Sequence, residues 1–276
     1  MPDLVEMNEE PSGDEFMVLV VSLVYVIAKG AVFYRELLFT ALLGRSVRQR
    51  LPLVFAPLAG LAILLPVLLC FAAKDIRSNH FYVFLFMTLG MAWMIFSTQL
   101  FPVFGLSVRE DVVEQGNQAA TVALSGALLG ILLAYAGGNI GEGPTIWTTI
   151  FPCFLASAGL LLLWFMVEFG SRISLAIAEE RDIASGWRLA SFLVSVGLIL
   201  GRAVAGDGQS ATGTIRDFAY QAWPSLGLAL VAMLAERNLR PTLIRPKPSV
   251  GKYGLLPGLI YLVIAVAVLI VLGRWK

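Results

Sequence analysis

Apolar stretches of about 20 residues recur along this chain from Phe16 to Gly273. A transmembrane helix needs roughly 20 mostly apolar residues to cross about 30 Å of hydrocarbon. Only helices and closed barrels satisfy their backbone groups in lipid, and these stretches are continuously apolar, without the alternation of barrel strands. The sequence therefore predicts an all-α, polytopic transmembrane helical bundle.

Eight spans take up nearly all of the 276 residues. The predicted spans are 16–34, 51–73, 81–105, 118–136, 147–167, 187–206, 219–235 and 254–273. The sixth and seventh are the weakest, because they are shorter or interrupted by polar groups. Only 14% of the residues are charged, against about 25% in a soluble domain. We therefore expect an acidic extracytoplasmic tail, residues 1–15, and a single transmembrane domain, residues 16–276.

Lys and Arg are unevenly divided between the two sides of these spans. With the N-terminus outside, the inner segments hold 13 of these residues and the outer segments hold 6. Cytoplasmic loops are enriched in Lys and Arg, so this ratio predicts that both termini lie outside. No Lys or Arg precedes Lys29, so the basic region of a cleavable signal peptide is missing and we expect the first span to be retained.

The spans also come in pairs, and equivalent members lie about 65–70 residues apart. Each pair is an inward helix, a charged inner loop and an outward helix, so copied pairs would be parallel repeats. The clearest match sets the segment from Glu114 against the segment from Glu179. The possible repeat units are 16–78, 79–143, 144–212 and 213–276. Hydrophobic spans of similar length would mimic part of this pattern, which leaves chance similarity as the alternative.

A more specific pattern lies between Phe84 and Gly206. A short acidic and polar loop ends in the step Gly116-Asn117 and leads into a helix with small residues at Ala119, Ala120, Gly126 and Gly130. In these features the segment resembles the YjfL-like family of bacterial inner-membrane proteins, whose function is unknown. The resemblance implies a bacterial inner membrane and a duplicated helix-pair fold, but no activity. The second copy departs from it, since Asp182 or Ala184 stands where an asparagine would be expected.

Lys29 is the most unexpected polar residue, because it interrupts the first span. A charged side chain at the centre of a helix costs roughly 2.5–3.5 kcal/mol on insertion scales. Lys29 precedes Arg35 by six residues, about 9 Å along a helix, so its stem could snorkel to the interface. The alternatives are an ion pair with Glu168, near the inner end of the fifth span, and a role in transport.

Two further polar residues are candidates for function. Arg202 lies in the outer half of the sixth span, where it is either solvated at the outer surface or lines a polar cavity. Asn117 begins the fourth span. As the N-cap it would accept a hydrogen bond from an orphan backbone N–H, and contact with a ligand or ion is the alternative.

No catalytic constellation is visible in the sequence. It contains no nucleophile paired with a histidine base, no phosphate-binding loop and no metal-ligand spacing. We therefore expect no enzymatic activity, no cofactor and no metal. The net charge of +1 gives no overall field that would favour nucleic acid.

The inner loops contain basic residues suited to docking. The candidates are Arg45, Arg48, Arg50, Arg237, Arg240, Arg245 and Lys247. The first hypothesis is a non-enzymatic component of a larger membrane assembly. It would contact membrane lipid and dock membrane or cytoplasmic proteins, or a second copy, through these loops. The alternative is a small-solute or ion transporter or channel, motivated by Lys29, Glu168, Arg202 and the prolines within spans.

Overall fold

The computed structural model describes the chain except for residues 1–10, 40–46, 144, 207–209, 243–247 and 274–276. The described residues form eleven α-helices, and no β-strand occurs among them. The α-helices are α1 (Gly13–Tyr25), α2 (Ala31–Phe39), α3 (Leu51–Cys70), α4 (Lys74–Ser78), α5 (His80–Ser97), α6 (Gln118–Gly138), α7 (Trp147–Ser171), α8 (Ile173–Ala178), α9 (Ile183–Val204), α10 (Ala211–Leu239) and α11 (Leu256–Leu272). Short π-helical turns cover Val26–Gly30, Val108–Glu114 and Gly251–Leu255, and 3₁₀ turns cover Val47–Gln49 and Phe101–Phe104.

Eight helical segments are long and apolar enough to cross a membrane. They are Gly13–Leu38, Leu51–Cys70, His80–Ser97, Gln118–Gly138, Trp147–Ser171, Ile183–Val204, Ala211–Leu239 and Gly251–Leu272. These segments confirm the predicted all-α bundle of about eight spans, and the chain is a multi-pass membrane protein. The first helix begins at Gly13, so the last residues of the predicted acidic tail belong to it.

The third and seventh spans differ most from their predicted ranges. α5, the helix of the third span, ends at Ser97 and not near residue 105. A 3₁₀ turn follows it, with Pro102 near its start and Gly105, whose φ is 76°, at its end. The seventh span was expected to be weak, but α10 has 29 residues. Its N-cap Ser210 accepts a hydrogen bond from the Gly213 N–H at 3.1 Å, which starts the helix well before its apolar part.

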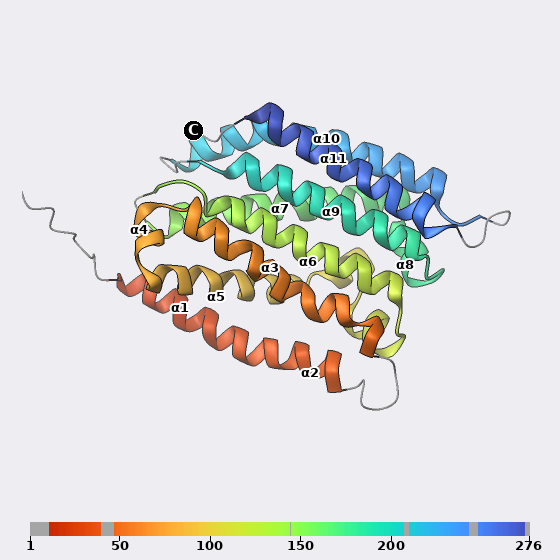
Figure 1. Ribbon diagram of the computed structural model, residues 1–276, viewed down its shortest axis with the longest axis horizontal. Helices are drawn as coiled ribbons and strands as arrows, with labels where there is room; N and C mark the ends of the chain where they lie inside the picture. The colour runs from red at the N-terminus through yellow and green to blue at the C-terminus, as the bar shows by residue number, and fades with distance from the viewer. Residues whose placement is uncertain (1–10, 40–46, 144, 207–209, 243–247, 274–276) are drawn as a thin grey trace, which may run out of the picture.

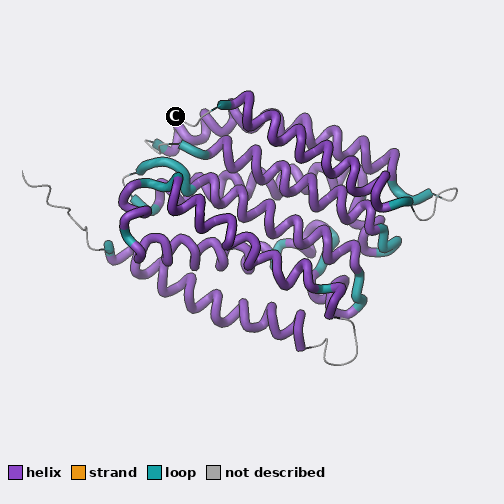
Figure 2. The backbone as a smooth tube through the Cα atoms, viewed as in Figure 1, coloured by secondary structure: helices purple, strands orange, loops and turns teal. Residues whose placement is uncertain are grey.

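The long helices form two antiparallel sets. α3, α6, α9 and α11 lie in a row in which each helix packs against the next, and all four begin at the same end of the bundle (Figure 1). α1, α5, α7 and α10 run the opposite way. The loops gather at the two ends (Figure 2). We call the end with Ser12 and α4 the outer end, and the end with α8 the inner end, after the predicted orientation.

The closest helix contact joins α6 to α9 at the centre of the row. A Cβ atom at Gly137 would lie 2.1 Å from the Gly201 carbonyl oxygen, and one at Gly130 would lie 2.4 Å from that of Leu193. On α9, a Cβ at Gly197 would lie 2.2 Å from the Gly130 carbonyl oxygen. Side chains larger than hydrogen do not fit there, so the glycines let the two backbones touch.

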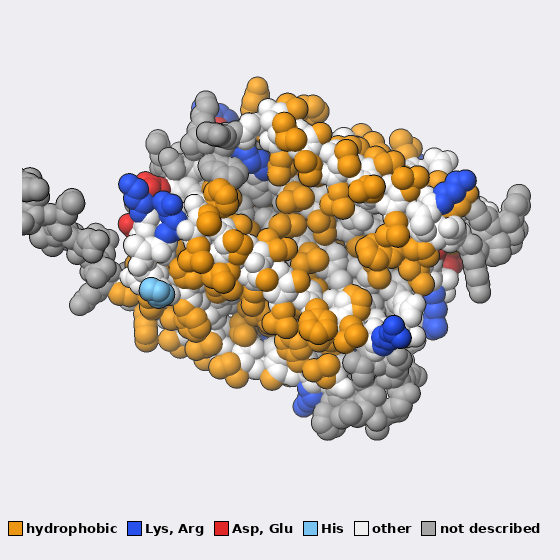
Figure 3. Space-filling model, viewed as in Figure 1, with side chains coloured by type: hydrophobic (Ala, Val, Ile, Leu, Met, Phe, Trp, Pro, Cys, Tyr) orange, Lys and Arg blue, Asp and Glu red, His pale blue; other side chains and the backbone are white. Residues whose placement is uncertain are grey.

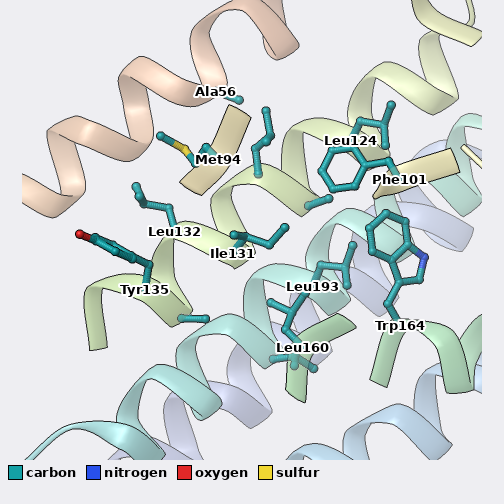
Figure 4. Close-up of a cluster of buried hydrophobic side chains, with 14 of the residues drawn as sticks. Ala56, Met94, Phe101, Leu124, Ile131, Leu132, Tyr135, Leu160, Trp164 and Leu193 are labelled. Carbon is teal, nitrogen blue, oxygen red and sulfur yellow. The ribbon is translucent and has the colours of Figure 1, made fainter. Parts of the chain in front are cut away.

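Aromatic and aliphatic side chains fill the space around this contact (Figure 4). Trp164 of α7 stacks on Phe104, with ring centroids 4.5 Å apart, and also packs against Phe101. Leu193 of α9 and Ile131 of α6 are fully buried in the same cluster. The face of the bundle in Figure 3 is also largely hydrophobic across its middle, with charged side chains toward the two ends. An apolar belt between charged ends is the surface that a bilayer requires.

The α6–α9 contact yields a stability prediction. Gly130→Ala should lower the melting temperature of the detergent-purified protein, because overpacking of this kind costs about 1–3 kcal/mol. Gly227→Ala on α10 is the matched control. A Cβ atom there meets nothing within 4 Å, so the melting temperature should stay the same or rise. Equal effects of the two substitutions would contradict the backbone contact.

Candidate functional site

The turns that precede α6 and α9 have the same backbone geometry at the inner end. Asn117 N–H donates to the Asp111 carbonyl and Asp182 N–H to the Ala176 carbonyl, each at 2.9 Å. The residue before each cap has a positive φ, 65° at Gly116 and 53° at Arg181. Asp182 follows Asn117 by 65 residues, so it stands at the position where the sequence pattern called for an asparagine. This match supports the repeat hypothesis, which stays a prediction.

Asn117 is the N-cap of α6, as one of the two sequence interpretations expected. Its Oδ1 accepts from the Ala119 and Ala120 N–H groups at 2.9 and 3.2 Å, and its Nδ2 donates to the Ile177 carbonyl at 2.7 Å. Arg50 makes a similar link from the start of α3, since its Nη2 donates to the Val113 carbonyl at 2.8 Å. The N-cap residues of α3 and α6 therefore each tie their helix to the inner turn of the next helix pair.

Within the described residues, a buried ionic cluster lies where α9, α10 and the turn before α11 meet. The Arg188 Nε lies 2.7 Å from the Glu236 Oε2, and its Nη2 donates to the Ser185 Oγ at 2.7 Å. The same Nη2 lies 3.6 Å from the Asp182 Oδ2, and Nη1 donates to the Tyr253 carbonyl. The side chains of Arg188 and Glu236 are 2% and 1% exposed. We call these groups the inner cluster.

The inner cluster sets two carboxylates against one guanidinium. Asp182 is also the N-cap of α9 and accepts from the Ala184 and Ser185 N–H groups at 3.2 and 2.9 Å. The positive end of the α9 dipole therefore offsets part of the second negative charge. Removing either partner of a buried ion pair leaves a desolvated charge without compensation. The cluster thus fixes where α10 ends relative to α9.

Asp111, in the π-helical turn before α6, is a third buried carboxyl group among the described residues of the inner end. Burial raises its pKa above the usual value, and the hydrogen bond from the Ser107 N–H, at 2.6 Å, partly opposes that change. A raised pKa means that the folded state binds this proton more tightly than the unfolded state. Asp111 therefore contributes stability at low pH that is lost as the pH rises through its folded-state pKa.

Arg202 lies at the outer end of α9, where its side chain is buried against the neighbouring helices. Its Nη1 donates to the Gln221 Oε1 at 3.1 Å, and its Nη2 donates to the Gly273 carbonyl at 3.1 Å. The guanidinium thereby caps the negative end of α11. Arg202 and Gln221 also line an outer cavity of about 630 Å³ with Arg216, Asp217 and Tyr220, as the cavity interpretation expected.

The structure does not bring Lys29 and Glu168 together. Lys29 is exposed on the first span, in its π-helical turn, which agrees with snorkelling. Glu168 accepts hydrogen bonds from Ser174, at 3.0 Å from the N–H and 2.6 Å from the hydroxyl. Its carboxylate therefore holds the start of α8, and no ion pair joins it to Lys29.

The predicted docking residues divide into three groups. Arg48, Arg237 and Arg240 are exposed at the inner end, and the Arg237 Nε donates to the Gly170 carbonyl at 2.7 Å. Arg50 is 1% exposed, so its assignment to a docking surface is wrong. A basic residue at a helix start can point inward to backbone carbonyls as well as outward to water, and sequence does not distinguish the two. Arg45, Arg245 and Lys247 lie outside the described residues.

Sequence reasoning missed the inner cluster. Arg188 was counted only as a charge of an inner loop, and Glu236 was not singled out at all. A signal existed, because an arginine in the first turns of one span and a glutamate just after the next span lie at the same membrane depth. Within the described part of the chain, no group of three or more His, Cys, Asp or Glu side chains is placed to hold a metal.

Part of the chain matches a known family model. Residues 70–204 match the model of a domain of unknown function, DUF350. This part of the chain is thus similar to an uncharacterised domain family, and the YjfL-like naming stays a prediction. The match runs from the end of α3 to the end of α9, so it includes Asn117, Arg188 and Arg202 but not Glu236. No curated protein and no solved structure matches the chain.

The inner cluster predicts strong coupling between Arg188 and Glu236. Arg188→Met and Glu236→Gln should each destabilise the protein, by about 3–5 kcal/mol for a broken buried pair, and the double variant should recover part of the loss. Thermal unfolding in detergent measures the cycle. The exposed pair Arg109–Glu114 is the control and should contribute less than about 1 kcal/mol. Additive losses at Arg188 and Glu236 would contradict the coupling.

Proposed function

We propose that this protein is a non-enzymatic component of a larger membrane assembly and that its inner end docks an acidic surface of a partner protein. One observation supports this function most directly. Exposed arginines stand at the inner end on helix termini that buried links hold in place, while glycine contacts and apolar side chains fill the middle of the bundle. A packed interior with a charged end suits binding at that end.

The chemistry of the inner end suits carboxylates. Arg237 is exposed, yet its Nε donates to the Gly170 carbonyl. This hydrogen bond fixes the direction in which the rest of its guanidinium points. Glu236, the preceding residue, is itself fixed in the inner cluster. A guanidinium held in one position loses little entropy when it binds a carboxylate bidentately. Further exposed basic residues at this end are Arg35, Arg172, Arg181 and Lys252.

The second candidate function is transport of a small solute or ion. One observation favours it: Arg202 is buried and lines a cavity that opens at the outer end of α9 and α10. Lys29 and Glu168, which first suggested transport, have the contacts described above and give it no support. The cavity supports a pathway only if polar groups continue inward from it.

We further propose the bacterial inner membrane as the location, with both termini outside, on the uneven division of Lys and Arg. In a Cys70→Ala background, Ser12→Cys should react in intact cells with a membrane-impermeant maleimide. Gln115→Cys, exposed at the inner end, should react only after lysis. Ser12 and Gln115 are both exposed, so accessibility to water is matched. The reversed labelling pattern would overturn the orientation.

The docking proposal predicts the loss of a partner. The combined variant Arg48→Gln, Arg237→Gln and Arg240→Gln should retain at least tenfold less of any partner that co-purifies with the tagged full chain in mild detergent. Higher salt should weaken the wild-type interaction as well. Glutamine keeps the side-chain length and removes the charge.

A matched control removes equal charge from the outer end, through Lys74→Gln, Arg77→Gln and Arg216→Gln, all exposed. This variant should keep the partner. Equal retention by the two variants would contradict docking at the inner end. Binding of the wild type to anionic vesicles alone, with no protein partner, would identify lipid as the ligand instead.

A further inference from the structure

One face of α9 has polar side chains at three depths. Arg188, Ser195 and Arg202 follow one another at intervals of seven residues, and that spacing returns to nearly the same side of a helix. Arg188 contacts α10 and the turn before α11, and Arg202 contacts α10 and the end of α11. Ser195 lies between them on the same face, so it faces the same junction of α10 and α11.

The facing side of α10 repeats this arrangement in the opposite direction. Gln221 pairs with Arg202 and Glu236 pairs with Arg188, and the buried Ser225 lies between them on the same face. The arginines are separated by about 21 Å along α9, and Gln221 and Glu236 by about 22.5 Å along α10, at 1.5 Å per residue. The polar groups of the two helices therefore stand at matching depths.

Two hydroxyl groups in this junction lack partners. Within the described residues, neither the Tyr261 Oη nor the Ser195 Oγ has a hydrogen-bond partner. Tyr261 is 2% exposed and Ser195 is fully buried. The Tyr261 side chain, on α11, lies near the charges of Arg188 and Glu236. A buried hydroxyl without a partner is costly, and phenylalanine and alanine would pack there without that cost.

We propose that Glu236, Tyr261, Ser195 and the outer cavity at Arg202 form a path that conducts protons between the two sides of the membrane. We call it the hydroxyl path. Short chains of water molecules would bridge its polar groups, as water does at buried polar groups in other proteins. This inference goes beyond docking and gives the transport candidate a specific substrate. It does not depend on the inner arginines binding a partner.

The packing favours a proton over a hydrated ion. A Cβ atom at Gly258 would lie 2.4 Å from the Ser191 Oγ, and one at Gly254 would lie 2.9 Å from the Ala184 Cα. α9 and α11 therefore touch along the inner half of the path, where a hydrated ion would have to pass. A proton needs only groups that both donate and accept hydrogen bonds, and Ser and Tyr hydroxyls do both. At the outer end, Arg202 would repel a positive charge, but the α11 carbonyls that accept its hydrogen bonds weaken that repulsion.

The transfer balances at each group. A hydroxyl oxygen accepts a proton from the outer side and releases its own proton inward, and rotation of the O–H bond then restores it. The Glu236 carboxylate accepts the proton, which weakens its pairing with Arg188, while Arg188 keeps the Asp182 carboxylate nearby. Release of the proton to water at the inner end restores the ion pair. The proton gradient across the membrane supplies the driving force.

The test uses the purified full chain in liposomes that enclose a pH-sensitive dye, with potassium and valinomycin to clamp the voltage and an imposed pH gradient. The wild type should acidify the lumen faster than protein-free liposomes. Ser195→Ala and Tyr261→Phe should each reduce that rate at least tenfold. Both substitutions remove an unpartnered hydroxyl and keep the surrounding shape, so the melting temperature should not fall.

Two controls remove similar hydroxyls elsewhere. Tyr34→Phe removes an unpartnered hydroxyl from a half-buried tyrosine of α2, and Ser125→Ala removes a buried serine hydroxyl from α6. Both should keep the wild-type rate. A wild-type rate equal to that of empty liposomes, unchanged rates in both path variants, or equal losses in the controls would each overturn the proposal. A rate that requires chloride and vanishes in gluconate would overturn it in favour of an anion path.

Discussion

The structure depends on direct contact between the backbones of α6 and α9. Lipid is as apolar as leucine, so transmembrane helices gain little by exchanging lipid for apolar side chains and associate instead through close packing. A side chain at Gly197 would collide with the Gly130 backbone, and one at Gly137 would collide with the Gly201 backbone near the outer end. Because α6 and α9 are the most buried spans, every other long helix is placed by packing on this pair or on a neighbour of it.

Polar groups gather at the ends of this bundle because helix termini leave backbone groups unsatisfied. Asn117 satisfies N–H groups of its own helix and carbonyls of α8, and Arg50 satisfies carbonyls from two other segments. The inner cluster is the same solution with full charges: Asp182 caps α9, and Arg188 joins that cap to Glu236. A helix end that must be capped is therefore also where charge can be buried with least cost.

Span number, span placement and the N-cap role of Asn117 could be predicted from sequence, because each depends on residues close together in the chain. Apolar length determines a span, and an asparagine before small residues determines a cap. The directions of Arg50, Glu168 and Arg188 could not be predicted, because they depend on which segment lies beside the helix end. Ser174, for example, takes the Glu168 carboxylate, which was the alternative partner suggested for Lys29. The start of α10 was missed for another reason: its first turns are polar, so hydropathy alone begins the span too late.

The two proposals meet at the inner end of α10, where Glu236 faces the interior and Arg237 faces outward. Successive residues of a helix point about 100° apart, so one turn can serve a buried path and an exposed surface without sharing a side chain. The consequences of substitution separate for the same reason. Arg237→Gln leaves the Glu236–Arg188 pair intact, and Tyr261→Phe leaves the exposed arginines in place. Loss of docking and loss of proton conduction therefore report on different faces of one helix end, and either proposal can fail while the other stands.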